Sequence, residues 1–221
     1  MMTISEDRLA RDAGEWRNTT IAIEAFKKGL SQPQDVAIYL EDEPDATYGA
    51  LAKEALRLIA ALRDLGLSTG DVISFQFPNW REGAVVDIAA AALGLVVNPI
   101  VPIYRDAELR FILSDAESKL ILIPDQHRSI DYVNMICRLR PELPCLKHVV
   151  TLRATAEYPD TTRYEQLIDC DPADESSLPV IDPNSIKCRL YTSGTTGFPK
   201  AVLHSHNTLT RIIDNTSDHS G

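Results

Sequence analysis

Tyr191-Thr192-Ser193-Gly194-Thr195-Thr196-Gly197-Phe198-Pro199-Lys200 is the stretch that decides how this chain is interpreted. It combines serine and threonine hydroxyls with two glycines and one lysine. Glycines let the backbone take positive φ and approach a ligand closely. Backbone N–H groups, hydroxyls and a lysine can then bind phosphate oxygens. The composition predicts a phosphate-binding loop, whose candidate ligand-binding residues are Thr192, Ser193, Gly194, Thr195, Thr196, Gly197 and Lys200.

The spacing within this loop differs from that of a Walker loop, Gly-x-x-x-x-Gly-Lys-Ser/Thr. Gly194 and Gly197 are only three positions apart, and Ala201 stands where a Walker loop has the Ser or Thr that binds magnesium. Pro199 disfavours helical geometry at the residue before it, and the apolar run that follows indicates a strand. The expected context is a strand over 186–191, a flexible loop and a second strand, which argues against a Walker-type nucleotide hydrolase.

Upstream of the loop, apolar strand-like runs alternate with helix-like segments. Several of the predicted strands are apolar on both faces, which is typical of a parallel sheet covered by helices on both sides. The sequence therefore predicts an α/β fold of mostly parallel sheets flanked by helices. Strands are predicted at 36–40, 72–77, 95–97, 120–123 and 149–152, and helices at 47–65, 79–93, 106–113 and 131–139.

Capping residues predict where these helices begin and end. Gly66 and Gly94 are expected to end the first two long helices. Asn79 is predicted to be an N-cap residue, and Glu82, three residues later, is predicted to accept a hydrogen bond from the Asn79 backbone N–H. Asp106 is expected to cap the helix that follows.

Residues 169–185 form an acidic, proline-containing stretch without a basic residue. Like-charged stretches with few apolar residues resist packing, so we expect an exposed connector here. The chain is then predicted to comprise an N-terminal α/β subdomain over 1–168, the connector over 169–185, and the incomplete start of a second subdomain, with the phosphate loop, over 186–221.

The overall composition, with 44% hydrophobic and 24% charged residues, is that of an ordinary soluble protein. The formal net charge of -10 argues against a nucleic-acid partner, because neutralising phosphates requires clustered Lys and Arg. No apolar run approaches the ~20 residues of a membrane span. The polar N-terminus has no signal-peptide core, so we expect a cytoplasmic protein. The four cysteines have no metal-ligand spacing, so reduced thiols and no metal site are expected.

The loop and its flanks resemble the signature of the adenylate-forming, or AMP-binding, superfamily, which includes the acyl-CoA synthetases, peptide-synthetase adenylation domains and luciferases. The pattern Tyr-Thr-Ser-Gly-Thr-Thr-Gly-x-Pro-Lys agrees throughout, and residues 204–209 are similar to the segment that follows it in the acyl-CoA branch. Ala201 and the pair Cys188-Arg189 depart from the usual pattern without removing a phosphate donor. The segments 13–16, 65–72, 77–80 and 93–105 extend the resemblance over nearly the whole chain. They are most similar to the cyclohexanecarboxylate and medium-chain acyl-CoA ligase type.

This resemblance implies an acid–thiol ligase that activates a carboxylic acid with ATP to an acyl-adenylate and then transfers the acyl group to CoA. It implies that the loop hydroxyls bind the β- and γ-phosphates. It also implies that Gly194 and Gly197 let the loop wrap around these phosphates, and that Lys200 neutralises their charge. It also implies that Mg²⁺ bridges the phosphates through a ligand downstream, and that the adenine-binding, ribose-binding and catalytic lysine residues lie beyond Gly221. The chain is therefore expected to be an N-terminal fragment without a catalytic residue of its own and without turnover alone.

Two other functions stay open at this point. One is an adenylation domain that loads a carrier protein, and the other is a truncated, non-catalytic interaction module that keeps the loop as a relic. The acid and the oligomeric state are not specified by the sequence.

Three further side chains near the loop have structural interpretations. His204 and His206 are expected to share one face of the strand after the loop, where packing is favoured over a metal or general-base role because a third ligand is missing. Cys188 is expected to be an inert thiol.

Overall fold

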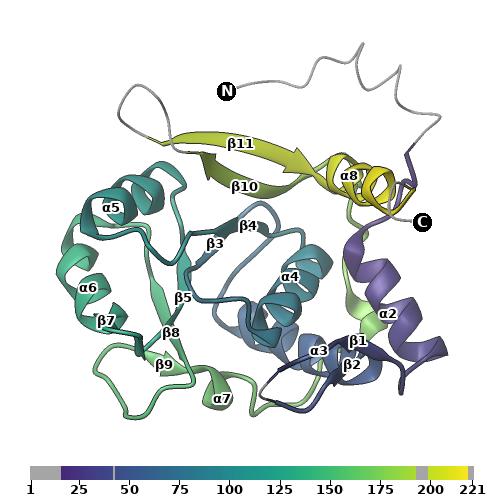
Figure 1. Cartoon of the computed structure of the whole chain (residues 1–221), viewed down its shortest axis with the longest axis horizontal. Helices are drawn as coiled ribbons and strands as arrows, with labels where there is room; N and C mark the ends of the chain where they lie inside the picture. Colours follow the sequence, from purple (N-terminus) through teal and green to yellow (C-terminus); the bar gives the residue numbers. More distant parts are fainter. Residues whose placement is uncertain (1–15, 42, 193–198, 219–221) are drawn as a thin grey trace.

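A seven-stranded sheet runs through the computed structural model, which describes residues 16–41, 43–192 and 199–218 (Figure 1). The sheet contains β3 (Val72–Phe75), β4 (Val96–Pro99), β5 (Leu120–Pro124), β8 (His148–Leu152), β9 (Thr162–Arg163), β10 (Ile186–Thr192) and β11 (Lys200–Ser205). Its strand order is β11-β10-β4-β3-β5-β8-β9, and all neighbours pair in parallel except β10 with β11. The predicted α/β fold with a mostly parallel sheet is confirmed.

Helices and two small hairpins surround this sheet. The helices are α2 (Ile21–Ser31), α3 (Tyr48–Asp64), α4 (Arg81–Leu93), α5 (Asp106–Asp115), α6 (Tyr132–Leu139), α7 (Tyr164–Leu167) and α8 (His206–Asp218), with 3₁₀ turns η1 (Arg140–Glu142) and η2 (Glu175–Ser177). The hairpins pair β1 (Val36–Ile38) with β2 (Ala46–Thr47), and β6 (Gln126–His127) with β7 (Ile130–Asp131). No helix within the described ranges is long and apolar enough to cross a lipid bilayer.

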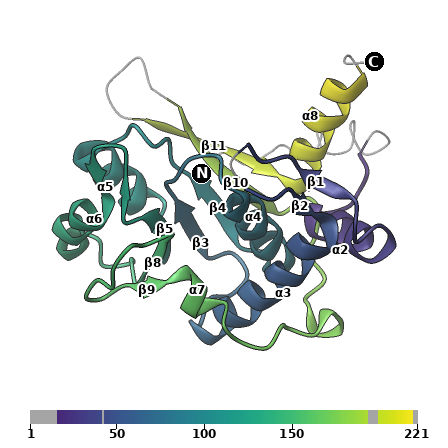
Figure 2. The same ribbon diagram turned by 60° about the horizontal axis from the view of Figure 1, so that its bottom comes forward.

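The helices cover the sheet on both faces, α2, α3 and α4 on one and α5 and α6 on the other (Figures 1 and 2). Because successive side chains of a strand point to opposite faces, the continuous apolar run of β5 serves both layers. Leu120 and Leu122 join the core under α3 and α4, whereas Ile121 and Ile123 join the core under α5 and α6. This division is the reason that the central strands are apolar throughout.

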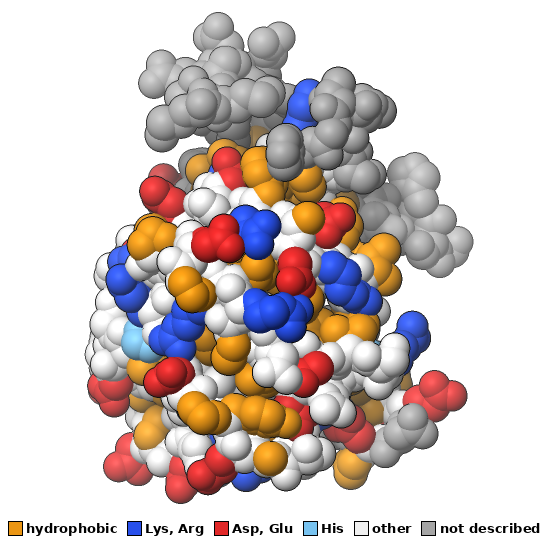
Figure 3. Space-filling view, turned by 90° about the vertical axis from the view of Figure 1, so that its left-hand side faces the viewer, with side chains coloured by type: hydrophobic (Ala, Val, Ile, Leu, Met, Phe, Trp, Pro, Cys, Tyr) orange, Lys and Arg blue, Asp and Glu red, His pale blue; other side chains and the backbone are white. Residues whose placement is uncertain are grey.

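On the side covered by α5 and α6, basic and acidic side chains lie interspersed on the surface (Figure 3). Two ion pairs join α5 to the segment that contains α6 and η1. Arg138 pairs with Asp106 at 3.1 Å, and Arg110 pairs with Glu142 at 3.0 Å. These pairs hold the N-terminal half of α5 against its neighbour.

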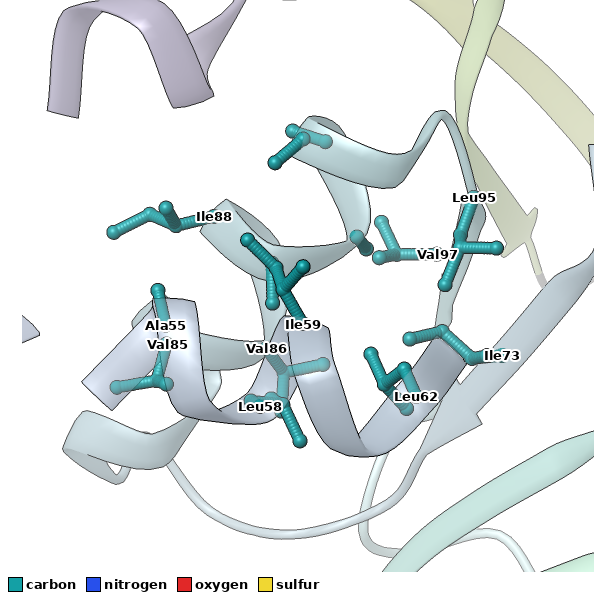
Figure 4. Packing of buried hydrophobic residues seen from close by; sticks show 14 of the residues in the cluster. Ala55, Leu58, Ile59, Leu62, Ile73, Val85, Val86, Ile88, Leu95 and Val97 are labelled. Atoms are coloured by element: carbon teal, nitrogen blue, oxygen red, sulfur yellow. The ribbon is translucent and has the colours of Figure 1, made fainter. Parts of the chain in front are cut away.

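On the opposite face, α3 and α4 supply a dense aliphatic layer (Figure 4). Leu58, Ile59 and Leu62 of α3 are at most 1% exposed and pack toward Ile73 and Val97 of the sheet. Each fully buried aliphatic side chain of this kind stabilises the fold by about 1.5–3 kcal/mol relative to an exposed one. The helical spacing of these residues in the sequence therefore correctly predicted the face of α3 that is buried in the core.

The predicted helix ends are partly confirmed. Gly66 (φ 77°) follows α3, and Gly94 (φ 68°) ends α4 in the left-handed conformation, which glycine adopts without strain. The predicted Asn79–Glu82 cap is wrong, because Trp80 is the N-cap residue of α4 and makes no side-chain cap bond. Glu82 is buried and instead accepts two hydrogen bonds from Arg153, at 3.0 and 2.9 Å. Burying a charged carboxylate is costly unless it is paired and hydrogen-bonded, and Arg153 supplies both for Glu82.

The N-cap of α5 also differs from the prediction by one position. Arg105 is the N-cap residue and Asp106 is the first helical residue, where its charge favours the helix N-terminus.

The strand order reverses at β3, the first strand of the parallel core. The chain passes from β3 to β4 on one side and then returns to β5 on the other side of β3. In open α/β sheets, ligands bind at the carboxyl ends of the strands near such a reversal. The carboxyl ends of β3, β4, β5, β8 and β10 all lie at this edge, because these strands are parallel.

The segment 169–185 runs along α3 and is mostly exposed. It is nevertheless held in place, since Ala173 N–H donates to Leu56 O at 2.9 Å and the Arg63 guanidinium donates to the Ser177 carbonyl at 2.8 Å. Beyond it, β10 pairs with β4 in the same sheet as the preceding strands. The division of the chain at 168 and 185 stays a prediction.

Candidate functional site

The candidate site begins at an antiparallel hairpin formed by β10 and β11, the two strands predicted on either side of the loop. Thr192 ends β10, Lys200 begins β11, and the two residues are direct partners in the register. The Thr192 hydroxyl donates to the Lys200 carbonyl at 3.4 Å. Ser193, Gly194, Thr195, Thr196 and Gly197 lie outside the described residues. The structure therefore brings together Thr192 and Lys200 of the predicted set.

Thr192 and Lys200 are both exposed at the mouth of this hairpin. Directly opposite residues of an antiparallel pair place their side chains on the same face, with Cβ atoms about 4.5–5.5 Å apart. A hydroxyl donor and an ammonium group therefore stand side by side. Such a pair can donate to an anion, and the ammonium can neutralise part of the anion's charge.

Neighbouring strands pair with β10 on both of its sides, with β4 near its beginning and with β11 along its length. Cys188 of β10 lies in register with Val97 of β4, and β11 pairs along the other side of β10 from Ile186 to Thr192. The hairpin mouth therefore projects from the same edge as the carboxyl end of β4. This is the edge at which α/β sheets bind their ligands.

The loop that follows β4 is fixed by buried side chains. The Gln76 amide donates to the carbonyls of Val101 and Tyr104, both at 3.0 Å. The Tyr132 hydroxyl and the Arg105 guanidinium donate to the Pro102 carbonyl, at 3.1 and 2.8 Å. These hydrogen bonds fix the path of the loop that follows β4.

Three side chains connect β10 to the C-terminal end of α5. Asp115 Oδ2 accepts from the Tyr191 hydroxyl at 2.5 Å and from the Arg189 guanidinium at 2.6 Å. The Tyr191 ring is 91% buried and packs edge-on against Phe111 with a centroid distance of 6.4 Å. Burial and the Asp115 hydrogen bond both raise the pKa of Tyr191, so its hydroxyl remains a donor.

On the other face of β10, Lys187 and Cys188 are buried under α4. The Lys187 ammonium, with only 4% of its side chain exposed, donates to Asp87 Oδ1 of α4. Burial raises the pKa of the Cys188 thiol to about 11. A thiol is a nucleophile only as the thiolate, which supports the inert role expected for Cys188.

The prediction that His204 and His206 share a strand face is wrong. β11 ends at Ser205, and His206 is the first residue of α8. Because the chain turns from strand to helix between them, the alternation that relates two strand residues does not apply. His206 is 1% exposed, and neither of its ring nitrogens has a hydrogen-bond partner among the described residues.

The environment of His206 predicts that acid destabilises the protein. Burial, followed by the nearby Lys187 charge, lowers the pKa of His206 from 6.5 to about 4, against the opposing effect of Asp87 and Asp182. Between these two values the unfolded chain binds the proton that the folded chain excludes, so stability falls as pH decreases. The linkage relation gives a loss of about 2 kcal/mol between pH 7 and pH 5.

Urea-induced unfolding at pH 7 and pH 5 measures this loss. The variant His206→Gln cannot take up the proton, so we expect its unfolding free energy to change less over the same interval by about 2 kcal/mol. An equal change in wild type and variant contradicts the prediction, whatever the absolute stability of the variant.

Metal ligands do not converge in the described part of the chain. Within it, no group of three or more His, Cys, Asp or Glu side chains is placed to hold a metal ion. Thr192 and Lys200, the described residues at the ends of the loop, contribute no carboxylate. These residues do not fit a magnesium site by themselves.

The ion pairs that hold β10 join residues that lie far apart in the sequence. Asp115 and Arg189 are 74 residues apart, and Asp87 and Lys187 are 100 residues apart. Each charge was unremarkable in its own segment. The one available hint was the presence of a lysine and an arginine inside an otherwise apolar strand, which calls for a buried counter-charge.

Comparison with known proteins identifies relatives along nearly the whole chain. A family model described as "AMP-binding enzyme" matches residues 26–220. The medium-chain fatty-acid–CoA ligase of Escherichia coli (strain K12) is 30% identical over 213 residues, which are 94% of this chain and 37% of that protein. The sulfoacetate–CoA ligase of Cupriavidus necator is 34% identical over 77% of this chain and 31% of that protein.

Solved structures agree with these matches. Acetoacetyl-CoA synthetase from Streptomyces lividans superposes with a TM-score of 0.76 and 26% identity, over 86% of this chain and 31% of that chain. The chain thus spans roughly a third of the length of these relatives.

Proposed function

This chain belongs to the family of AMP-binding enzymes, and we propose that it forms part of an ATP-dependent acid–thiol ligase. In the proposed reaction a carboxylate oxygen attacks the α-phosphorus of ATP, the bond to the bridging oxygen breaks, and pyrophosphate leaves. The sulfur of CoA then attacks the carbonyl of the acyl-adenylate, and AMP leaves. The observation that carries the proposal is the pairing of Thr192 with Lys200 at the mouth of the hydroxyl- and glycine-rich hairpin.

Thr192 and Lys200 act on the leaving pyrophosphate in this proposal. Substitution at phosphorus needs little covalent help from a protein, so positioning and charge stabilisation provide most of the catalysis. The Thr192 hydroxyl exchanges its 3.4 Å bond to the Lys200 carbonyl for one to a phosphate oxygen, and the Lys200 ammonium compensates negative charge. Ser193, Thr195 and Thr196 supply further hydroxyls, while Gly194 and Gly197 allow the backbone N–H groups to approach.

Magnesium has no assigned ligand in this proposal. It accompanies ATP as the phosphate-bound ion, but the described residues offer no carboxylate cluster to hold it.

The proposed acid is a carboxylate of medium chain length or with a compact ring. The similarity to the E. coli medium-chain ligase favours the medium chain length, and the resemblance of residues 93–105 to the cyclohexanecarboxylate ligase type favours the compact ring. CoA is the proposed acceptor, because the relatives described above are CoA ligases or a CoA synthetase.

Exchange of labelled pyrophosphate into ATP tests the first half-reaction. The complete protein that contains this chain is assayed with a panel of straight-chain, alicyclic and aromatic acids, and we expect exchange that depends on one class of acid. Formation of a thioester on free CoA then tests the second half-reaction. Absence of exchange with every acid would overturn the proposal, and thioester formation only on a carrier protein would reassign the acceptor.

A further inference from the structure

The carboxylate of Asp115 lies at the C-terminal end of α5, where it does not stabilise the helix. Asp115 is the last residue of α5, and the last turn contains no basic residue. A negative charge is unfavourable near the negative end of the helix dipole. Its position is therefore better explained by its tertiary contacts.

Within the described part of the chain, the hydrogen bonds and ion pair of Asp115 reach one other element, β10, the strand that leads to the hairpin mouth. The Tyr191 hydroxyl and the Arg189 guanidinium both converge on Asp115 Oδ2, at 2.5 and 2.6 Å. The guanidinium carbon also lies 5.5 Å from the centroid of the Tyr191 ring. Residues two apart in a strand face the same side, so these two side chains meet the helix together.

Thr192 follows Tyr191 directly, and Lys200 is paired with Thr192. Displacement of the Tyr191 end of β10 therefore moves both described residues of the candidate site. The opposite half of β10 is held separately, through Lys187 and Asp87 on the other face of the sheet.

We propose that Asp115 is a positioning residue, which fixes Thr192 and Lys200 for pyrophosphate departure by holding Tyr191 and Arg189 against α5. This inference rests on the proposed function and names a part of its machinery outside the phosphate loop. Reacting groups displaced by about 1 Å can slow a reaction roughly a hundredfold, so loss of this contact reduces the rate more than it reduces acid binding.

The chain offers a matched control on the same helix. Asp106 begins α5 and pairs with Arg138 of α6, and its side chain is 43% exposed, compared with 42% for Asp115. Asp115→Asn and Asp106→Asn therefore each remove one charge from a carboxylate of similar exposure, and of the two ion pairs the Asp115 pair contacts β10.

Two measurements on the complete protein test the inference. In pyrophosphate exchange, we expect Asp115→Asn to lower kcat by roughly ten- to a hundredfold with little change in KM for the acid. Asp106→Asn should change kcat by no more than about twofold, as for an exposed ion pair. If Tyr191→Phe acts through the same bond, the double variant Asp115→Asn/Tyr191→Phe should lose little more than Asp115→Asn alone.

Amide hydrogen exchange provides the second measurement and does not require activity. We expect Asp115→Asn, and not Asp106→Asn, to accelerate exchange in 189–192 while β3 and β5 keep the wild-type rates. Equal behaviour of the two aspartate variants, or acceleration throughout the sheet, would overturn the positioning role. A wild-type protein without pyrophosphate exchange would overturn the proposed function instead, and hydrogen exchange would still decide the role of Asp115.

Discussion

Replacing Lys200 with methionine is expected to reduce acid-dependent pyrophosphate exchange by about 10²–10³-fold, the usual effect of removing one donor from developing negative charge. Lys200 stands at the hairpin mouth, exposed and opposite Thr192. Methionine keeps most of the length of the side chain and removes its charge. Because the ammonium is exposed, the folded state should be little affected, and the loss should appear in kcat.

Two further variants make the Lys200 prediction specific. Lys200→Arg keeps the charge but spreads it over a planar group, so an intermediate rate is expected. Lys53→Met removes an exposed lysine of α3, a helix that covers one face of the sheet, and should leave the rate unchanged. Exchange by Lys200→Met at the wild-type rate would remove this lysine from the proposed mechanism.

The elements of the fold were largely predictable because they depend on local patterns. The continuous apolar run of β5 and the helical spacing of Leu58, Ile59 and Leu62 each indicate burial without knowledge of the partner. Glycines with positive φ, such as Gly94, mark the helix ends for the same local reason. The candidate phosphate loop was also proposed from a local pattern, because its hydroxyls, glycines and lysine are close together in the chain.

The interactions around the site were not predictable, because they depend on which strands become neighbours. β10 pairs with β4 although the paired residues, Cys188 and Val97, are about ninety positions apart in the sequence. Only this topology brings Lys187 over Asp87, and Arg189 beside Asp115. The Asn79–Glu82 prediction failed for a related reason, since Arg153 approaches Glu82 from a distant segment.

Lys187 is deeply buried, and its ion-pair partner among the described residues is Asp87. Lys187 keeps 4% of its side-chain surface exposed, and Asp87 keeps 27%. Removing a charge from water costs several kcal/mol unless another charge compensates it. The pair therefore holds β10 to α4 only while both charges are present.

Asp87→Ala is accordingly expected to destabilise the protein by about 3–5 kcal/mol, because it leaves the Lys187 ammonium buried without its counter-charge. Urea-induced unfolding measures this loss, and Glu142→Ala, which breaks the exposed Arg110 pair, should cost at most about 1 kcal/mol. The double variant Lys187→Met/Asp87→Leu should recover most of the lost stability, since apolar side chains can replace a buried ion pair. A double variant as unstable as Asp87→Ala would show that packing around Asp87, and not the uncompensated charge of Lys187, determines the loss of stability.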